Sequence, residues 1–290
     1  MAAVSLAEDV YSLDSEDALT AGALGFMPRI LVLTTLPHSK PTVNRFERIN
    51  GRHSLRLEAP RSIGLPYGVY PRLILACLTT QAIRTKSRAI DLGRTPNDFA
   101  RKIGVTPISG PRGTTTRLLD QLQRLCSTRL TWRYSKDFRN QKTGSGFIVT
   151  NDHRLQNLAD RLLRRPRSWR PRAVLSHELF PEVTRSAVPV DLRAIQHLRR
   201  SPLAIDIYVW LTYRMSYLRR PCLIPWEALE NQFGSGYSRA RDFRRRLLEH
   251  LGTVVGLYST ARLQTNSSGL LLLPSPAHVP GRQQPSSTAI

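Results

Sequence analysis

The segment Ser201–Leu218 constrains the fold of this chain more than any other. Ser201 can cap a helix, and Pro202 occupies the first helical position, where a missing N–H costs nothing. Apolar residues then fall on nearly every side of the predicted helix, with Asp206 and Arg214 as its charged members. A helix that is apolar almost all round is buried, but this run is too short and too charged to span a membrane. We therefore predict a buried helix around which other elements pack.

The residues after this helix follow the order of a winged helix. We predict a short strand at Cys222–Ile224, a helix at Trp226–Phe233, a glycine turn, an arginine-rich helix at Ser238–Leu251 and a β-rich stretch at Val254–Tyr258. Helix, strand, helix, turn, basic helix and hairpin in this order are typical of a winged helix that reads DNA.

The first half of the chain shows the same order of parts. Its predicted elements are a helix from Tyr70 to Lys86, a strand at Arg88–Leu92, a helix from Pro96 to Ile103 capped by Thr95, a helix at Thr114–Ser127, and wing strands at Arg129–Tyr134 and Phe147–Thr150. The two halves share little sequence identity, so the repeat is one of element order and not of residue identity. The predicted fold class is therefore α+β, with two tandem winged-helix domains, that is, helix-turn-helix units with β-hairpin wings.

Two further elements precede these. Arg45–Ala59 predicts a β-hairpin around Asn50-Gly51, because Asn-Gly between alternating apolar runs is a strong hairpin signal, and we expect it to cover an edge of the first domain. Ile30–Thr35 predicts a strand. The predicted organisation is a disordered acidic N-terminus at 1–25, a first winged-helix domain with the hairpin at 26–150, a basic linker at 151–172, a second winged-helix DNA-binding domain at 173–266, and a disordered Ser/Pro tail at 267–290. Residues 1–25 are either an internal decoy for a basic face or a plain tail.

The net charge of +22, carried mostly by arginine, favours a polyanionic partner. The expected partner is nucleic acid in the first place and an anionic membrane in the second. The alternative is a basic protein that has no such partner. Arginine suits phosphate and guanine because its fork binds two acceptors at once.

The sequence predicts no enzyme, no cofactor and no metal. Cys77, Cys126 and Cys222 lie far apart and form no CxxC motif, so zinc is not expected. The seven histidines are scattered, and no P-loop is present. Three cysteines in apolar surroundings, an acidic N-terminus unlike a secretory signal and no membrane-spanning run together predict a cytoplasmic protein.

Two predicted helices carry the candidate DNA-binding residues. On Thr114–Ser127 and on Ser238–Leu251 one face is apolar while the other presents polar and basic side chains, as a recognition helix requires. The candidate DNA-binding residues lie on these two helices, in the loop before the first helix and in the basic linker. They are Arg112, Thr116, Arg117, Arg124, Arg164, Arg165, Arg239, Arg241, Arg244, Arg245 and Arg246. Arg241 and Arg245 are assigned to bases, and Arg239 and Arg246 to the DNA backbone. A solvated amphipathic helix is the alternative.

Several motifs resemble the plasmid-encoded RepA replication initiators of Gram-negative bacteria. They are Gly64–Leu73, Thr114–Leu125, Pro189–Ala194, Ser201–Arg214, Trp226–Leu229 and Gln232–Gly234, within a resemblance that extends from about Arg29 to Tyr258. The resemblance implies a bacterial, plasmid-encoded protein that binds repeated sites (iterons) in double-stranded plasmid origin DNA and promotes opening of the origin. It also implies recruitment of the host initiator DnaA and the replicative helicase, a role in copy control, and a homodimer in some members, which repress their own gene.

Three other functions stay open. A winged-helix transcriptional repressor would bind a promoter but leave the origin duplex closed. A metal-dependent origin nickase needs a tyrosine nucleophile and a metal held by close histidines, whereas Tyr208, Tyr213 and Tyr217 lie on the predicted buried helix. An RNA-binding role is disfavoured, because no exposed aromatic stacking motif is evident.

Overall fold

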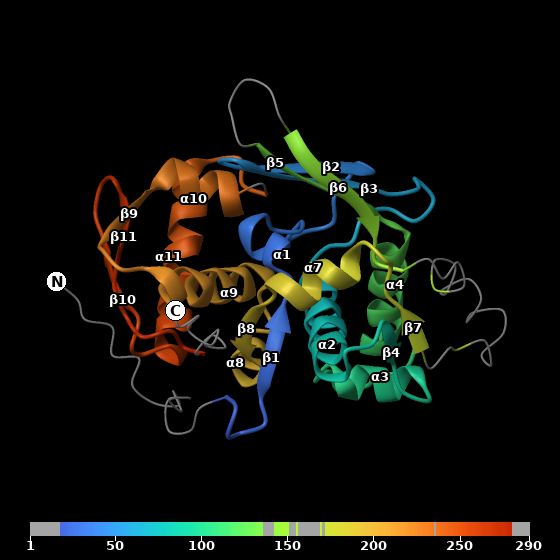
Figure 1. Cartoon of the computed structure of the whole chain (residues 1–290). Coiled ribbons are helices and arrows are strands. Elements are labelled where there is room, and N and C mark those ends of the chain that lie inside the picture. Colours follow the sequence, from blue (N-terminus) through green and yellow to red (C-terminus); the bar gives the residue numbers. More distant parts are fainter. Residues whose placement is uncertain are drawn as a thin grey trace, which may run out of the picture.

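The computed structural model describes residues 18–135, 142–150, 155, 169, 172–234 and 236–279, and it is a mixed α+β structure with several small sheets (Figure 1). Its helices are α1 (Arg29–Leu33), α2 (Val69–Thr85), α3 (Pro96–Lys102), α4 (Thr114–Ser127), α7 (Leu179–Ser186), α8 (Leu192–His197), α9 (Pro202–Tyr217), α10 (Trp226–Phe233) and α11 (Ala240–Leu257). Its strands are β1 (Leu24–Met27), β2 (Arg45–Asn50), β3 (His53–Glu58), β4 (Ala89–Asp91), β5 (Arg129–Ser135), β6 (Lys142–Ile148), β7 (Arg172–Val174), β8 (Val188–Asp191), β9 (Cys222–Pro225), β10 (Arg262–Thr265) and β11 (Gly269–Leu273).

Helix α9 occupies the centre of the molecule, as its all-round apolar pattern predicts. The Ser201 hydroxyl accepts a hydrogen bond from the Ala204 N–H at 3.2 Å, which confirms the predicted cap. Buried residues on all sides of α9 allow it to pack against α1, α2 and α11. Since α2 in turn packs against α4, the helices α11, α9, α2 and α4 form a row across the molecule, with α11 and α4 at its ends (Figure 1). None of the described helices is long and apolar enough to cross a membrane.

Strands β9, β10 and β11 of the second half form a three-stranded antiparallel sheet. In this sheet, β11 lies between β10 and β9. Along the chain, the elements follow the order α9, β9, α10, α11, β10 and β11. The expected β-rich stretch at Val254–Tyr258 is wrong, because Val254 and Leu257 are buried on the last turns of α11. The hairpin follows later and includes β11, whose Leu270 and Leu272 are buried, so the predicted tail cannot begin at 267.

The first half differs in its sheets. The predicted hairpin at Arg45–Ala59 is confirmed as β2 and β3, with Gly51 at φ +56° in the turn between them. It extends the β5–β6 hairpin into one antiparallel sheet of order β2-β3-β5-β6, and β6 begins at Lys142 rather than at Phe147. Strand β4 pairs with the distant β7 instead of with this hairpin.

The two halves are interleaved rather than strictly sequential. Strand β1, at the N-terminal end of the described chain, pairs with β8. The expected strand at Ile30–Thr35 is wrong, because residues 29–33 form α1, whose Ile30, Leu31 and Val32 are buried. The Gln232 side chain of α10 donates to the Val32 carbonyl at 2.9 Å. Residues 24–35 therefore pack with elements from the second half, although the sequence predicted that most of them belong to the first domain.

A buried ion pair joins α2 to α9 at the middle of the helix row. Arg72 donates to both carboxylate oxygens of Asp206, at 2.7 and 2.6 Å, and it is only 2% exposed. Its remaining N–H groups reach the carbonyls of Gly68 at 2.6 Å and Leu36 at 2.9 Å. The His38 Nε2–H donates to Asp206 at 2.8 Å. We call Arg72, Asp206 and His38 the central clamp.

The protonation states of the central clamp are set by burial and by the pairing. Burial lowers the pKa of His38, and the nearby guanidinium groups of Arg72 and Arg48 lower it further, although the bond to Asp206 opposes the shift. Burial alone would raise the pKa of Asp206, but the Arg72 charge and its hydrogen bonds hold that pKa below its usual value. The folded protein therefore contains a neutral His38 and an ionised Asp206 at neutral pH.

Acidification below about pH 6.5 is expected to destabilise the protein through His38. Because the pKa of His38 is lowered on folding, the unfolded chain takes up the proton first, so stability falls with pH until the folded pKa is reached. The test is the free energy of unfolding in denaturant between about pH 7.5 and 5.5. The variant His38→Gln should show a smaller pH dependence, with a remainder from His53 and His250, whose pKa values burial also lowers. An unchanged slope in this variant would contradict the assignment.

Candidate nucleic-acid interface

Helix α11 has the two faces that a recognition helix needs. Its buried residues Phe243, Leu247, Leu251 and Val254 pack toward the core, because they recur at helical spacing. The candidates Arg241, Arg245 and Arg246 lie outside this buried face, Arg239 directly precedes the helix, and all four are exposed. Arg241 and Arg245 are four residues apart and therefore lie one above the other on the same face.

Arg241, Arg245 and Arg246, all within α11, differ in whether their side chains are paired. Arg246 forms an exposed ion pair with Glu249 at 2.9 Å, so part of its charge is balanced within the helix. In the described part of the chain, neither Arg241 nor Arg245 forms an ion pair or a hydrogen bond through its side chain. Both guanidinium groups are thus available to base edges or phosphates.

Arg244 occupies a structural position instead. Its guanidinium lies 4.2 Å from the centre of the Trp226 ring, and it donates to the Asn266 carbonyl at 3.1 Å. The Trp226 indole N–H donates to the same carbonyl at 3.1 Å. Arg244 therefore ties α11 to α10 and to the β10–β11 turn, a structural role that the sequence did not predict.

The variant Arg244→Ala is expected to lose about 1–2 kcal/mol of stability while keeping its preference for specific DNA. The loss combines the cation–π contact with one hydrogen bond to a charged donor. The check is denaturant unfolding together with binding to an origin repeat and to a shuffled duplex. Arg244→Lys serves as the matched control, since it keeps the charge but not the planar fork that stacks on the ring. A loss of discrimination at unchanged stability would contradict this structural role.

Helix α4 carries fewer available groups than its sequence suggests. Arg112, Thr116 and Arg117 are exposed, and the Thr116 hydroxyl donates to the Gly110 carbonyl at 2.8 Å. Arg124 is different, because its side chain is 15% exposed, pairs with Asp120 at 2.8 Å and lies 5.7 Å from the centre of the Tyr67 ring.

The polar face expected on α4 is therefore narrower than the sequence indicates. Gln121, a polar residue of this helix, is buried and accepts a hydrogen bond from the Tyr67 N–H at 2.9 Å. Arg124 contacts Tyr67 before the start of α2 and is mostly shielded from solvent, so its DNA-binding role stays a prediction. The candidates Arg164 and Arg165 lie outside the described residues.

Sequence reasoning missed Arg199 and Arg200 as candidates. These exposed residues form the turn between α8 and α9. The signal was present, since two arginines stand directly before the Ser201-Pro202 helix start, but many arginine pairs occur in this chain and nothing in the sequence distinguishes this one.

The groups expected of a nickase are not assembled in the described residues. No group of three or more His, Cys, Asp or Glu side chains there is placed to hold a metal ion. Tyr208 is fully buried, its hydroxyl accepts from the Asp191 N–H at 2.9 Å, and burial raises its pKa. Tyr208 is therefore a core residue, as its position on the central helix predicts.

These features define the class of protein: an α+β protein with an arginine-bearing helix at each end of one packed helix row. The family model described as plasmid-encoded RepA protein matches residues 65–227, more than half of the chain. The chain therefore belongs to the RepA family, which confirms the resemblance seen in the sequence and supports a role in the initiation of plasmid replication.

The chain is also similar to solved structures at low identity. A crystal structure of selenomethionine derivatives of domain 2 and domain 3 of RctB aligns with a TM-score of 0.52 and 12% identity, covering 87% of this chain and 99% of that chain. A second crystal structure, of RctB domains 2-3, aligns with a TM-score of 0.46 and 12% identity, covering 83% and 94%. The first likeness concerns the fold alone. A search of curated proteins gave no significant match.

Proposed function

We propose that this protein is a plasmid replication initiator that binds iterons in double-stranded origin DNA through two winged-helix units. The observation that carries the proposal is the helix row with α11 at one end and α4 at the other (Figure 1). Membership of the RepA family supports the biological setting.

The topology of the second half supports a winged helix there. The order α9, β9, α10, α11, β10, β11 with the sheet order β10-β11-β9 is that of a winged helix, in which the short strand joins the wing hairpin. The first half has the same order of helices followed by the β5–β6 hairpin. We include the first half in the proposal as a modified unit, whose hairpin is widened by β2 and β3 and whose short strand β4 pairs with β7.

The arrangement of the two recognition helices bears on how they bind DNA. Helices α9 and α2 lie between α11 and α4 in the row, so two intervening helices hold the recognition helices apart. Successive major grooves on one face of B-DNA repeat every ~34 Å. We propose that α4 and α11, through the side chains that extend from them, enter adjacent major grooves of one repeat.

Origin opening is the next step of the proposal. Counterion release favours binding of the basic surface to DNA, and copies bound to a row of repeats bend the origin, which eases opening of adjacent A·T-rich duplex. Host DnaA and the replicative helicase are the proposed partners, and a dimer that represses the protein's own gene is a second proposed state. The protein is proposed to act without enzymatic activity of its own.

The experiment that tests this proposal is a footprint over a salt series on the DNA that flanks the gene, with a shuffled duplex as control. Repeat-phased protection that survives moderate salt supports specific binding, whereas equal binding to both DNAs that vanishes with salt overturns it. Permanganate probing of a supercoiled origin then separates an initiator, which exposes unpaired thymines, from a repressor, which leaves the duplex closed.

A further inference from the structure

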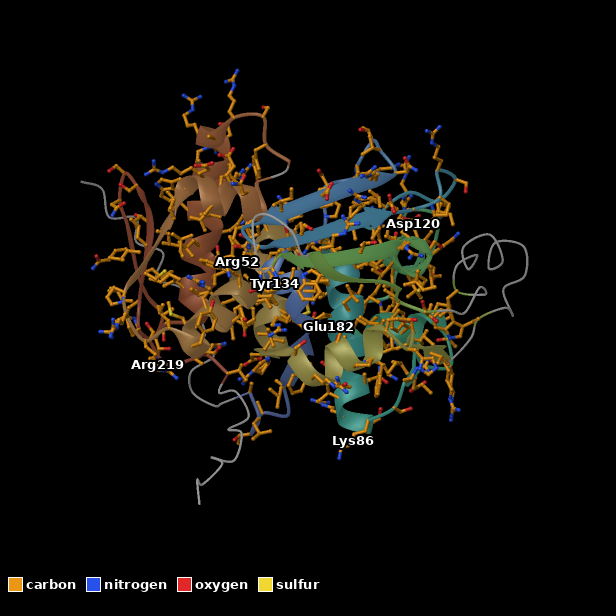
Figure 2. All side chains as sticks on the ribbon, turned by 45° about the horizontal axis from the view of Figure 1, so that its top comes forward. Arg52, Lys86, Asp120, Tyr134, Glu182 and Arg219 are labelled. Carbon is orange, nitrogen blue, oxygen red and sulfur yellow. The ribbon has the colours of Figure 1, made fainter. Side chains whose placement is uncertain are left out.

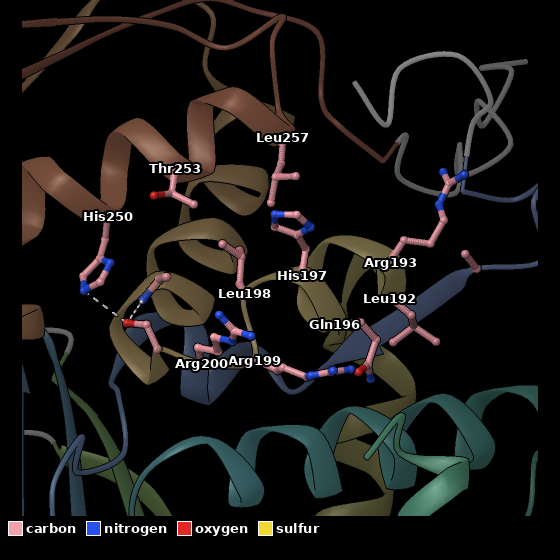
Figure 3. A pocket seen from close by; sticks show the side chains of 13 residues that line it. Leu192, Arg193, Gln196, His197, Leu198, Arg199, Arg200, His250, Thr253 and Leu257 are labelled. Atoms are coloured by element: carbon pink, nitrogen blue, oxygen red, sulfur yellow. Dashed lines mark hydrogen bonds between the residues drawn. The ribbon is translucent and has the colours of Figure 1, made fainter. Parts of the chain in front are cut away.

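The turn that carries Arg199 and Arg200 lies between two clefts. One cleft, of about 980 Å³, is bounded by α8 and by the second half of α11, which contributes His250 and Thr253. In Figure 3, His250 and Thr253 extend from α11 toward Leu198, Arg199 and Arg200 on the turn below. The second cleft, of about 450 Å³, is bounded by the starts of α2 and α4 and includes Arg117. Arg199 and Arg200 line both clefts.

The residues that line the two clefts extend from one recognition helix to the other, with the two arginines of the turn between them. Arg246 lies four residues before His250 on α11, so both belong to the same face of the helix. From His250 the lining residues continue across Arg199 and Arg200 to Arg117 on α4.

The turn is held firmly in this position. The Gln196 side chain donates to the Ile103 carbonyl at 2.7 Å, and Arg199 donates to the Gly104 carbonyl at 3.2 Å. Both bonds attach the end of α8 to the end of α3. A cation held in place by neighbouring elements loses less conformational freedom when it binds an anion.

The charge of the turn is not balanced within the described chain. Neither Arg199 nor Arg200 forms an ion pair there, and the first cleft has no carboxylate among its lining residues. Asp120, which lines the second cleft, already pairs with Arg124 at 2.8 Å. By contrast, Arg193 in the first cleft pairs with Asp191 at 2.7 Å. The unbalanced charge of the two clefts thus lies on the turn and, in the second cleft, also on Arg117.

We propose that Arg199 and Arg200 bind phosphates of the DNA backbone in the stretch between the two major grooves entered by α4 and α11. This inference rests on the proposed function. A duplex that lies against both recognition helices presents its minor-groove edge to the region between them, and the groups nearest the protein there are phosphates rather than base edges. The turn therefore fixes the register of the two helices on one repeat and adds affinity without reading sequence.

The test compares Arg199→Ala/Arg200→Ala with Arg219→Ala/Arg220→Ala. Arg219 and Arg220 form a second exposed pair, just after the opposite end of α9, and Figure 2 places Arg219 at the far side of the molecule from Asp120 of α4. Both double variants remove the same charge. The slope of log affinity against log salt changes by about 0.9 for each phosphate that the protein no longer neutralises, so the first variant should reduce it by about 1.8. The second variant should leave the slope near that of the unaltered protein.

Two further variants separate binding from folding. Arg200→Ala removes no hydrogen bond seen in the described chain and should reduce the slope by about 0.9, while Arg199→Lys/Arg200→Lys should restore it, because lysine also neutralises phosphate. The ratio of affinities for origin and shuffled DNA should stay unchanged in all of these variants. Equal slope changes in the Arg199/Arg200 and Arg219/Arg220 variants, or none in either, would overturn the inference. If the unaltered protein fails to prefer origin DNA, it is the proposed function that fails instead.

Discussion

The variant Arg241→Ala/Arg245→Ala is expected to lose its ability to distinguish an origin repeat from shuffled DNA while still binding both at low salt. An arginine that binds guanine through two hydrogen bonds contributes roughly 1–3 kcal/mol of discrimination, so removing two should cost at least about 2 kcal/mol, or roughly 30-fold. The low-salt binding persists because other basic residues, among them Arg239 and Arg117, still neutralise phosphates.

The structure makes this assignment sharper than the sequence did. Of the five arginines between 239 and 246, Arg244 is bound to Trp226 and Asn266, and Arg246 is paired with Glu249. Arg239 precedes the first residue of α11. Arg241 and Arg245 remain as exposed residues in the first two turns of the helix, which are the turns that enter a groove in a helix-turn-helix protein.

The measurement is a competition titration of each duplex at several salt concentrations. Arg219→Ala/Arg220→Ala is the matched control, since it removes two exposed charges outside α11 and should weaken binding to both duplexes equally, if at all. A double variant of Arg241 and Arg245 that still prefers the repeat by the original factor would show that α11 is not the helix that reads bases.

Local sequence signals predicted the helices well and their packing less well. Helices α4 and α10 have the predicted bounds, because helical periodicity depends on neighbours in sequence. Thr95 caps α3 through a reciprocal bond with Asp98, as its spacing indicates. By contrast, Val254 and Val255 favour a strand by propensity, yet α11 continues through them because Val254 is buried in the core.

The candidate site shows the same division. The exposure of Arg241 and Arg245 follows from helical periodicity alone, and the Asp120–Arg124 pair could have been inferred from its i, i+4 spacing. The stacking of Arg244 on Trp226 and the place of Arg199 between two clefts depend on elements distant in sequence. The same holds for the pairing of β1 with β8, which joins residues 24–27 to residues 188–191. No local pattern records such contacts.

The central clamp joins the two helices, α9 and α2, on which α11 and α4 pack. Helices α9 and α2 form the middle of the row, and Asp206 and Arg72 join them away from solvent. Because α11 packs on α9 and α4 packs on α2, a shift at this joint changes the separation of the two helices. Stability and DNA register should therefore fail together when the clamp is broken.

The variant Asp206→Ala is expected to lose about 3–5 kcal/mol of stability, since it leaves the Arg72 guanidinium buried without its counter-charge. Asp206→Asn should lose less, because the amide oxygen still accepts one of the Arg72 hydrogen bonds. Glu249→Ala is the surface control: it breaks the exposed pair with Arg246, and such pairs contribute about 0–1 kcal/mol. Denaturant unfolding at neutral pH measures all three, and footprinting with repeats lengthened or shortened by one base pair measures the register. If Asp206→Ala unfolds no more readily than Glu249→Ala, or keeps the original preference for repeat length, the central clamp does not position the recognition helices.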